Sequence, residues 1–433
     1  MSARLRSGSY EADLNPSLGL PISGYYQPKI ATQFHDRLYA KAISLSSGDE
    51  RVLMASLDLV GLAKRTCDEI RKEAEDRLKV PKENVVLLST HTHSGPETFS
   101  SNASLSETPP EVPMRTELEE NIGWMKRMIT FALEQAMKDE RPVDRTSVTS
   151  TPVKGMFSNR NDPARTIDRT LTTLRLGREK RPLFLVNHNC HPTVLGANNV
   201  FYSADFPAYL SRSLAEKLNA EQVNCVTGSC GDVSTRLTLG NEFSKRRNLA
   251  NTVRYGETLA DLVVASQRNA KTLEDSSLYV ASRQLELKVK KHPDASESER
   301  LRLDLEKEIK RTREATRRSK LELALEGIKI WEETLAANPR GLPSTMGFDL
   351  GVVALGEEFA LVWASGELLS ETGLMLKQKS RFGTTMVSGY GNGDIGYIPL
   401  PQSYENLEYE AVVSPLEEGE TKRVEGELLR LLV

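Results

Sequence analysis

Two of the six histidines of the chain, His91 and His93, follow the apolar run Val85–Ser89. Residues two apart in an extended segment point to the same side of the chain. We therefore expect an extended His91-Thr92-His93 segment to bring both imidazoles to one place. Imidazole is the commonest metal ligand in proteins and the commonest general base near neutral pH. The pattern indicates a chemical site at the end of this strand, with a pair of surface histidines as the alternative.

Polar side chains also follow the other predicted strands. Ligands of α/β sheets bind at the carboxyl ends of the strands, so we expect the side chains that follow these strands to meet at one rim. They are Asp58, His91, His93, His188, His191, Asp232, Ser234, Glu367 and Tyr397. The alternative is that the loops lie apart, as they can in any α/β protein with several similar units.

Part of this set could hold a zinc ion. Zinc accepts nitrogen and oxygen ligands, and catalytic zinc sites keep one position open for water, whose pKa then falls towards neutrality. His91 and His191, from different strand ends, and the carboxylate of Glu367 supply such ligands. Pro192 favours an extended chain at His191. The alternatives are a buried core histidine at His191 and a carboxylate facing a helix N-terminus at Glu367.

Ser234 is a candidate nucleophile. It ends the segment Gly231–Ser234, which places a hydroxyl on a predicted tight turn after a strand. Nucleophilic serines are often displayed in this way, although the GxSxG pattern is absent. Such a serine needs a base or a metal nearby, and ordinary turn serines are far more common than nucleophiles.

The elements that would position these residues repeat three times along the chain. Each repeat has the pattern of a β-hairpin, a polar loop, a helix, a strand and a second polar loop. The predicted ranges are 40–45, 52–57, 63–78 and 85–89 in the first unit, 172–176, 183–186, 207–218 and 222–226 in the second, and 351–355, 359–363, 368–379 and 384–387 in the third. Strand–helix–strand units favour parallel pairing. We therefore predict an α/β fold with mixed sheets and helices packed outside them.

Residues 293–337 stand outside these units. They are rich in Glu, Lys and Arg, and an apolar stripe that includes Leu301, Leu325 and Trp331 runs through them. This pattern predicts a charged helical hairpin, inserted into a single domain of residues 1–433 and packed on it through one face. The same segment could serve as a dimerisation arm, which would make the protein a homo-oligomer.

The composition excludes several classes of protein. The 433 residues are 39% hydrophobic and 27% charged, as in an ordinary globular protein, and the net charge of −3 argues against a nucleic-acid binder. No window reaches the apolar length of a membrane span, and the first residues lack a signal-peptide core. The four cysteines have neither disulfide-scaffold nor CxxC zinc spacing. We expect a cytoplasmic protein with reduced thiols.

Taken together, these segments resemble the neutral/alkaline, non-lysosomal ceramidase family. The stretch 90–96 resembles the signature of the family, Gly231–Ser234 its serine loop, and His191-Pro192-Thr193 its His-x-Thr segment. Further similar segments are Ser365-Gly366-Glu367 for the Pro-Gly-Glu of the family, Asn159-Arg160, Gly396-Tyr397-Ile398 with Tyr409-Glu410, and Ala12–Pro16 with Gly24-Tyr25. The similar segments keep their order from about residue 8 to residue 412.

The resemblance implies specific roles for eight residues. It implies one zinc ion held by His91, His191, Glu367 and Tyr397. Ser234 takes the role assigned to the nucleophile. By the same resemblance, His93, Arg160 and Tyr409 would polarise the scissile carbonyl and hold the oxyanion. Whether water or Ser234 attacks first stays open.

The chain also departs from the pattern of the family. Ser365 stands where the family has a proline, and Thr235 follows Ser234 where proline is usual. Larger members carry a C-terminal immunoglobulin-like domain, for which this chain has no corresponding segment, so we expect the catalytic domain alone.

The expected function is therefore a zinc-dependent hydrolase that cleaves a C–N amide bond. Its substrate would be a small-molecule or lipid amide, either N-acylsphingosine or another N-acyl compound, and no nucleic acid or integral membrane segment is expected. A first alternative is a zinc-dependent esterase, lactonase or deacylase acting on a small polar substrate. A second alternative is an inactive homologue that acts as a binding protein.

Overall fold

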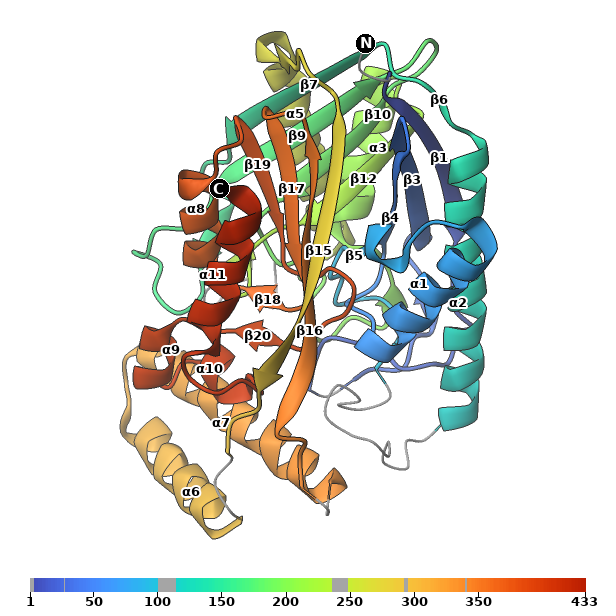
Figure 1. Ribbon diagram of the computed structural model, residues 1–433. Helices are drawn as coiled ribbons and strands as arrows, with labels where there is room; N and C mark the ends of the chain where they lie inside the picture. The colour runs from blue at the N-terminus through green and yellow to red at the C-terminus, as the bar shows by residue number, and fades with distance from the viewer. Residues whose placement is uncertain (1–3, 27, 100–113, 236–247, 292–294, 339–340) are drawn as a thin grey trace.

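Figure 1 shows the computed structural model, which describes residues 4–433 except 27, 100–113, 236–247, 292–294 and 339–340. Three mixed sheets make up its centre, and helices lie on their outer sides. No helix within the described ranges combines the length and the apolar character needed to cross a membrane.

The three predicted units are confirmed. In each unit two antiparallel strands are followed by a helix and by a strand that pairs parallel to the second one. The elements are β3 (Tyr39–Ser47), β4 (Glu50–Leu57), α1 (Lys64–Leu78) and β5 (Val85–Ser89); β9 (Thr170–Gly177), β10 (Leu183–His188), α3 (Phe206–Leu218) and β12 (Gln222–Thr227); and β16 (Thr345–Leu355), β17 (Phe359–Ala364), α8 (Ser370–Lys379) and β19 (Thr384–Ser388). The observed strands are equal to the predicted ones or longer by a few residues.

Additional strands widen each sheet at the side away from the parallel strand. The strand orders are β5-β4-β3-β1-β6, β12-β10-β9-β7-β14 and β15-β16-β17-β19. The added strands are β1 (Arg6–Asp13), β6 (Arg141–Pro142), β7 (Arg145–Pro152), β14 (Lys271–Thr272) and β15 (Leu278–Lys288).

The inner faces of the three sheets share one core. Ile43 of β3, Leu185 of β10 and Leu361 of β17 all belong to the same buried apolar cluster. Successive side chains of a strand point to opposite faces, so the intervening residues, such as Ala360 and Val362 of β17, pack outwards. Both faces of the strands are therefore buried, which explains why their sequences are almost continuously apolar.

Helices cover the outer faces of the sheets, as predicted. Residues of α1 and α2 (Arg115–Lys138) pack on the first sheet, and residues of α3 and α5 (Leu249–Ser266) pack on the second. Residues of α8 and α11 (Glu420–Leu432) cover the third sheet. Each sheet thus has its own outer core in addition to the shared inner one.

The predicted charged hairpin consists of α6 (Ala295–Arg311) and α7 (Ala315–Ala337). Its first predicted residues, 293 and 294, lie outside the described residues. Trp331 of α7 is buried, and its indole Nε1 donates a hydrogen bond of 2.5 Å to the carbonyl of Val412 in α10 (Tyr409–Val413). Leu301 and Leu303 of α6 are 40% and 41% exposed. The homo-oligomer stays a prediction.

Hydrogen bonds join the carboxyl ends of strands from all three sheets. Thr227 Oγ1, at the end of β12, donates to the carbonyl of Thr90 at 2.7 Å. Ser388 Oγ, at the end of β19, donates to the carbonyl of Thr227 at 2.9 Å. The amide of Ser89 donates to the carbonyl of Tyr390 at 3.1 Å. The loops that follow these strands therefore start from one place, near the middle of Figure 1 and above α6 and α7.

Candidate metal centre and active site

His91 reaches the centre through a turn, not through an extended strand. Strand β5 ends at Ser89, and His91 has a φ of 62°. The prediction of an extended His91-Thr92-His93 segment is therefore wrong. A left-handed backbone is uncommon for a residue with a side chain, and such strain is found where the surrounding structure enforces it. Here the amide of His91 donates to the carbonyl of Leu59 at 2.9 Å, and its Nδ1 donates to the carbonyl of Val60 at 2.7 Å.

His191 is held in the same way by the loop that follows β12. Its Nδ1 lies 2.7 Å from the carbonyl oxygen of Cys230, and its amide donates to the carbonyl of Val233 at 3.1 Å. A carbonyl can only accept a hydrogen bond, so Nδ1 carries the proton in both His91 and His191. Their Nε2 atoms consequently present lone pairs, which is the arrangement found in metal-binding histidines.

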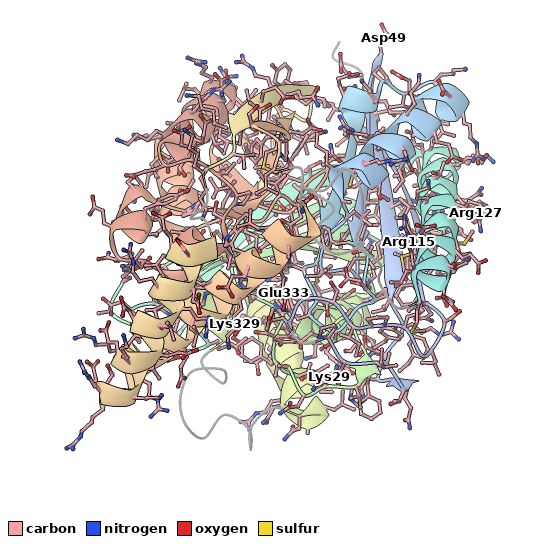
Figure 2. The ribbon with its side chains drawn as sticks, turned by 90° about the horizontal axis from the view of Figure 1, so that it is seen from below. Lys29, Asp49, Arg115, Arg127, Lys329 and Glu333 are labelled. Atoms are coloured by element: carbon pink, nitrogen blue, oxygen red, sulfur yellow. The ribbon has the colours of Figure 1, made fainter. Side chains whose placement is uncertain are left out.

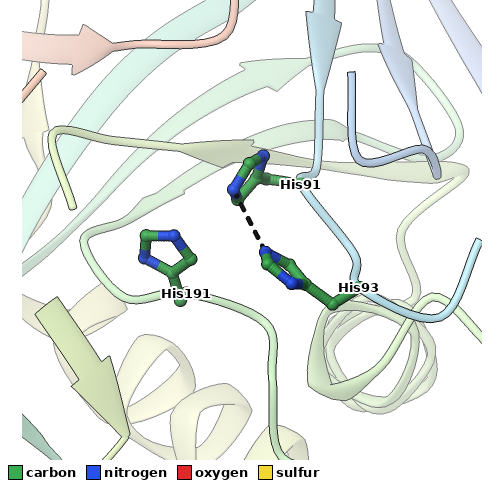
Figure 3. A group of neighbouring side chains, drawn as sticks. All are labelled: His91, His93 and His191. Atoms are coloured by element: carbon green, nitrogen blue, oxygen red, sulfur yellow. Dashed lines mark hydrogen bonds between the residues drawn. The ribbon is translucent and has the colours of Figure 1, made fainter. Parts of the chain in front are cut away.

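His93 completes a compact group of three imidazoles (Figure 3). Its Nε2 lies 3.3 Å from Nε2 of His91. The ring centroids of His93 and His191 are 5.5 Å apart, and those of His91 and His191 are 4.9 Å apart. One ligand atom from each ring lies within 4.8 Å of the other two. The three side chains could therefore hold a metal ion.

Glu367 brings a carboxylate to the same centre. Its Oε2 lies 3.5 Å from Nε2 of His91 and 3.3 Å from Nε2 of His191. Glu367 begins β18 (Glu367–Leu368), which pairs parallel to β20 (Tyr397–Ile398) with Glu367 opposite Tyr397. The register of this short ladder places Tyr397, the remaining predicted ligand, beside Glu367.

Burial shifts the proton equilibria of these groups. It lowers the pKa of His191 to about 3, with help from the positive charge of Arg160. It also lowers the pKa of His91 well below the ordinary value. Burial raises the pKa of Glu367 to about 8, against the charge of Arg160 and the hydroxyl of Tyr390. Both imidazoles are therefore neutral at pH 7, and a cation between them would supply the charge that the buried carboxylate lacks.

Arg160 and Tyr409 lie on the side of the centre formed by α10. The guanidinium Nε of Arg160 donates to Glu410 Oε1 at 2.7 Å. Its Cζ lies 5.3 Å from the ring centroids of both Tyr397 and Tyr409. Its Nη2 is buried and has no hydrogen-bond partner among the described residues. The guanidinium of Arg160 is thus held in place, and its Nη2 remains available as a hydrogen-bond donor.

Ser234 lies in β13 (Val233–Thr235), which pairs with β8 (Phe157–Asn159). It is half-buried and stands opposite Ser158. The expected turn lies just before it, where the amide of Val233 donates to the carbonyl of Cys230. The prediction that Ser234 sits on the turn itself is therefore wrong. Its neighbour Val233 contacts His191, so the serine still borders the centre.

Two residues expected at the rim lie elsewhere. His188 packs its ring against Phe206, with centroids 4.9 Å apart, and its Nε2 lies 3.4 Å from Thr227 Oγ1. Burial lowers its pKa to about 3, so it is a neutral core histidine. Asp58 Oδ2 accepts a hydrogen bond of 3.0 Å from the amide of Tyr39. Asp232 supports the site, because its carboxylate accepts from the amide of Ser370 at 2.8 Å and its carbonyl accepts from the amide of Arg160.

Two functional candidates were missed in the sequence. Tyr390 OH donates to Glu367 Oε2 at 3.2 Å, and its ring stacks on His91 with centroids 4.1 Å apart. Glu410 is fully buried and also accepts from Asn161 Nδ2 at 2.8 Å. The only signal for Tyr390 was its place in a loop after a strand, and the signal for Glu410 was its place beside Tyr409.

The residues present fit a divalent metal ion. Nε2 of His191 is buried and has no hydrogen-bond partner within the described part of the chain. A buried ring nitrogen without a partner is costly, and a metal ion would remove that cost. Nitrogen and carboxylate oxygen ligands suit zinc, with other divalent ions as chemical alternatives.

No family model matches the sequence, and no curated protein sequence matches it. Solved structures do match. The crystal structure of the neutral ceramidase from Pseudomonas aeruginosa aligns with a TM-score of 0.73 and 15% identity, over 100% of this chain and 74% of that one. The chain has the neutral ceramidase fold. A ceramidase complexed with C2 aligns with a TM-score of 0.70 and 15% identity, over 100% of this chain and 75% of that one.

The neutral ceramidase fold extends over the whole chain, so the resemblance seen in the sequence is confirmed at the level of the fold. At 15% identity the fold is what these alignments establish.

Proposed function

We propose that this protein is a metal-dependent hydrolase that cleaves the C–N bond of an N-acyl amide, with zinc as the metal. One observation carries the proposal: the lone pairs of two buried imidazoles and one carboxylate oxygen converge, with Glu367 Oε2 within 3.5 Å of Nε2 of both His91 and His191. Ceramide and other N-acyl compounds are candidate substrates.

The metal would be held by His91, His191, Glu367 and Tyr397, and when bound it would act as a Lewis acid on the amide carbonyl. His93 lies beside His91 and would orient the carbonyl oxygen by hydrogen bonding. Hydrolysis adds water across the bond, so that the acyl carbon keeps the hydroxyl and the amine leaves with the second proton. Ser234 or water supplies the attacking oxygen.

Arg160 and Tyr409 would hold the oxygen on which negative charge develops. Donors that are fixed before the reaction stabilise such charge most effectively in a site with little water. Glu410 accepts a hydrogen bond from Nε of Arg160 and so fixes the guanidinium, which leaves the buried Nη2 of Arg160 as a donor for the substrate. The neutral ceramidase fold is consistent with this assignment.

The test measures product formation by mass spectrometry from N-acyl substrates that range from N-acetyl amides to ceramide. Each is measured with metal-loaded protein, with chelator-treated protein, and after zinc is restored. We expect cleavage that disappears with the chelator and returns with zinc. Ser234→Ala is expected to keep the metal and lose most activity, whereas Ser276→Ala, in the loop between β14 and β15, should change neither.

Two results would contradict the proposal. Cleavage of esters or lactones without any amide cleavage would favour the esterase interpretation. If the protein bound no divalent metal in a stoichiometric amount and hydrolysed none of the substrates, an inactive binding protein would be favoured.

A further inference from the structure

Lys290 binds the helix that carries Tyr409 and Glu410. It follows β15, and its Nζ donates hydrogen bonds to the carbonyls of Ala411 at 2.7 Å and Val412 at 2.8 Å. Both carbonyls belong to the five-residue helix α10. The last carbonyls of a helix have no partner within it, and a lysine near the helix end can supply one. Lys290 therefore satisfies carbonyls that α10 leaves open.

The contacts of Lys290 fix its position. Its amide donates to the carbonyl of Pro415 at 2.8 Å, and its neighbour Val289 forms a β-bridge with Leu416, so the main chain is joined to the segment that follows α10. On the side of α7, the ring centroid of Trp331 lies 5.2 Å from Nζ. Indole attracts an ammonium group at this distance. The side chain is thus held between α7 and α10.

No carboxylate neutralises this ammonium group. Lys290 forms no ion pair with any residue that the structure describes, and its partial burial lowers its pKa to about 7. Glu326 and Lys329 of α7 line the pocket between this helix and the N-terminal loop. The other acidic groups of the elements around Lys290 bind different partners or are exposed: Glu332, Glu333, Glu410, Glu417 and Glu418.

The placement of Lys290 is unfavourable for folding unless it serves the site. Burying a cation without a counter-ion costs free energy, and natural proteins break such rules mainly at functional sites. The shortness of α10 supplies a reason here. A helix of five residues is too short to keep its conformation by itself, so its place depends on the contacts made at its ends.

The other end of α10 belongs to the centre. Tyr409 is its first residue, and Glu410 accepts hydrogen bonds from Arg160 Nε at 2.7 Å and from Asn161 Nδ2 at 2.8 Å. Burial raises the pKa of Tyr409 above the ordinary value, so the phenol keeps its proton at neutral pH. Arg160 and Tyr409 are the groups proposed to hold the oxyanion. A displacement of α10 would therefore move both groups away from that oxygen.

Helix α7 borders the entrance to the centre as well as α10. In Figure 2 it carries the labelled Lys329 and Glu333. It lines a pocket of about 400 Å³ whose opposite wall includes Tyr25, and the ring of Tyr25 packs against His93 with centroids 5.1 Å apart. A change in α7 should therefore alter substrate binding and KM, whereas a change in α10 should alter kcat.

We propose that Lys290 is a positioning residue for the reaction: its ammonium group, bound to the carbonyls of Ala411 and Val412, holds α10 so that Tyr409 and Arg160 face the oxygen on which charge develops. The inference rests on the proposed amide hydrolysis and adds a residue to it. Donors to this oxygen bind the transition state more strongly than the substrate, so their misplacement lowers kcat.

The test compares three variants with wild type. Lys290→Met removes the charge and the donors and keeps a chain of similar length. Lys290→Arg keeps a cation with donors for both carbonyls, and its charge does not change with pH. Lys288→Met is the matched control, because Lys288 is an exposed lysine two residues earlier in the same strand. For each protein, kcat and KM for a cleaved amide and the metal content are measured from pH 6 to pH 9.

We expect kcat of Lys290→Met to fall about tenfold at pH 6, the size expected for one charged hydrogen bond, with KM and metal content unchanged. Lys290→Arg should recover most of kcat, and Lys288→Met should match wild type. The kcat ratio of wild type to Lys290→Met should decrease as the pH rises through about 7, because a neutral amine donates more weakly. The ratio of Lys290→Arg to Lys290→Met should stay constant.

Three results would overturn the proposal. The first is an unchanged kcat in Lys290→Met. The second is a loss of activity that Lys290→Arg does not recover although the variant is folded and holds its metal. The third is a ratio of wild type to Lys290→Met that is larger at pH 9 than at pH 6, since the ammonium form is the stronger donor.

Hydrogen exchange separates this inference from the proposed function. In Lys290→Met, the amides of residues 409–414 should exchange about tenfold faster than in wild type, while those of α11 stay unchanged. That result supports the role of Lys290 in holding α10 even where wild type cleaves no amide, in which case the proposed hydrolysis fails. Cleavage by wild type, with exchange and kcat both unchanged in Lys290→Met, overturns the role of Lys290 alone.

Discussion

The centre and the entrance of the candidate site are built from different kinds of structure. At the centre, His91, His191 and Glu367 follow strands of the three sheets, and backbone carbonyls fix both imidazoles. The entrance is a pocket of about 400 Å³ between the N-terminal loop, which carries Tyr26 and Lys29, and α7, which carries Lys329 and lies outside the repeating units. Rigid sheets hold groups that need accurate placement, and loops or insertions vary more easily. We therefore expect the centre to determine the chemistry and the entrance to determine which substrate is accepted.

The largest effect should come from removing a metal ligand at the centre. In His191→Ala we expect loss of the bound metal and at least a ~10³-fold loss of activity, because a metal contributes several kcal/mol to transition-state stabilisation. Metal content by mass spectrometry and kcat/KM check this. His188→Asn is the matched control, since His188 is equally buried in the preceding strand but packs on Phe206.

The control variant should keep its metal while losing some stability, by about 1–3 kcal/mol as in other substitutions of buried residues. If His188→Asn lost the metal and His191→Ala kept it, the assignment of the centre would be reversed. If both variants lost the metal equally while circular dichroism showed that both were folded, metal binding would depend on residues beyond the proposed ligands.

A smaller effect is expected from Tyr390→Phe, which keeps the ring on His91 and removes the hydroxyl 3.2 Å from Glu367 Oε2. Removing a group that orients a metal ligand typically weakens metal binding by about 10–100-fold. Competition with a fluorescent chelator measures the affinity. Tyr404→Phe removes a hydroxyl that donates to the carbonyl of Leu416 and should leave the affinity unchanged. Unchanged affinity in Tyr390→Phe would remove Tyr390 from the support of the centre.

Much of the fold and the chemical elements of the centre could be predicted from the sequence. Apolar strands, turn residues and amphipathic helices recur in a fixed order, and this local order determines the three units. His91, His191 and Glu367 could be found because each follows such a strand. Tyr390 also follows a strand, but its role could not be predicted, because that role depends on contacts with residues far away in the chain. The left-handed backbone of His91 is likewise enforced by carbonyls of another loop.

The entrance was harder to predict than the centre. The charges of residues 293–337 indicated a solvated hairpin, and nothing local shows that α7 faces the pocket. Trp331 illustrates the point, since its spacing placed it in an apolar stripe while its indole N–H bonds to α10. That contact joins α7 to α10, which begins with Tyr409, so we expect the entrance and the centre to be coupled.

This coupling predicts an intermediate effect for Trp331→Phe. The variant keeps an apolar ring and removes the hydrogen bond to the carbonyl of Val412, which still accepts from Lys290 Nζ at 2.8 Å. One hydrogen bond contributes about 1 kcal/mol, so we expect kcat/KM to fall by up to about tenfold with the metal content unchanged. Trp124→Phe, on α2 beside the first sheet, is the control. Loss of metal in Trp331→Phe would show that metal binding at the centre depends on the structure of the entrance.

The smallest effect should come from Tyr26→Phe, which acts on the entrance alone. Tyr26 OH donates to Glu333 Oε1 of α7 at 2.5 Å and so joins the two walls of the pocket. Its loss should raise KM a few-fold, since an exposed hydrogen bond contributes at most about 1 kcal/mol, and should leave kcat and metal content unchanged. Tyr10→Phe, exposed on β1, should change none of these.

The hydrogen bond that Tyr26 donates to Glu333 raises the pKa of Tyr26 to about 12, above the ordinary value of about 10. The phenol therefore donates throughout the neutral range, and its contribution is fully present below pH 10 and lost only as the pH rises towards 12. The difference in KM between wild type and Tyr26→Phe should then be constant from pH 6 to pH 9. A difference that vanishes within that range would place the titrating group elsewhere in the pocket. A fall in kcat in Tyr26→Phe would contradict the division of roles between entrance and centre, because a contact of the walls alone has no part in the chemical step.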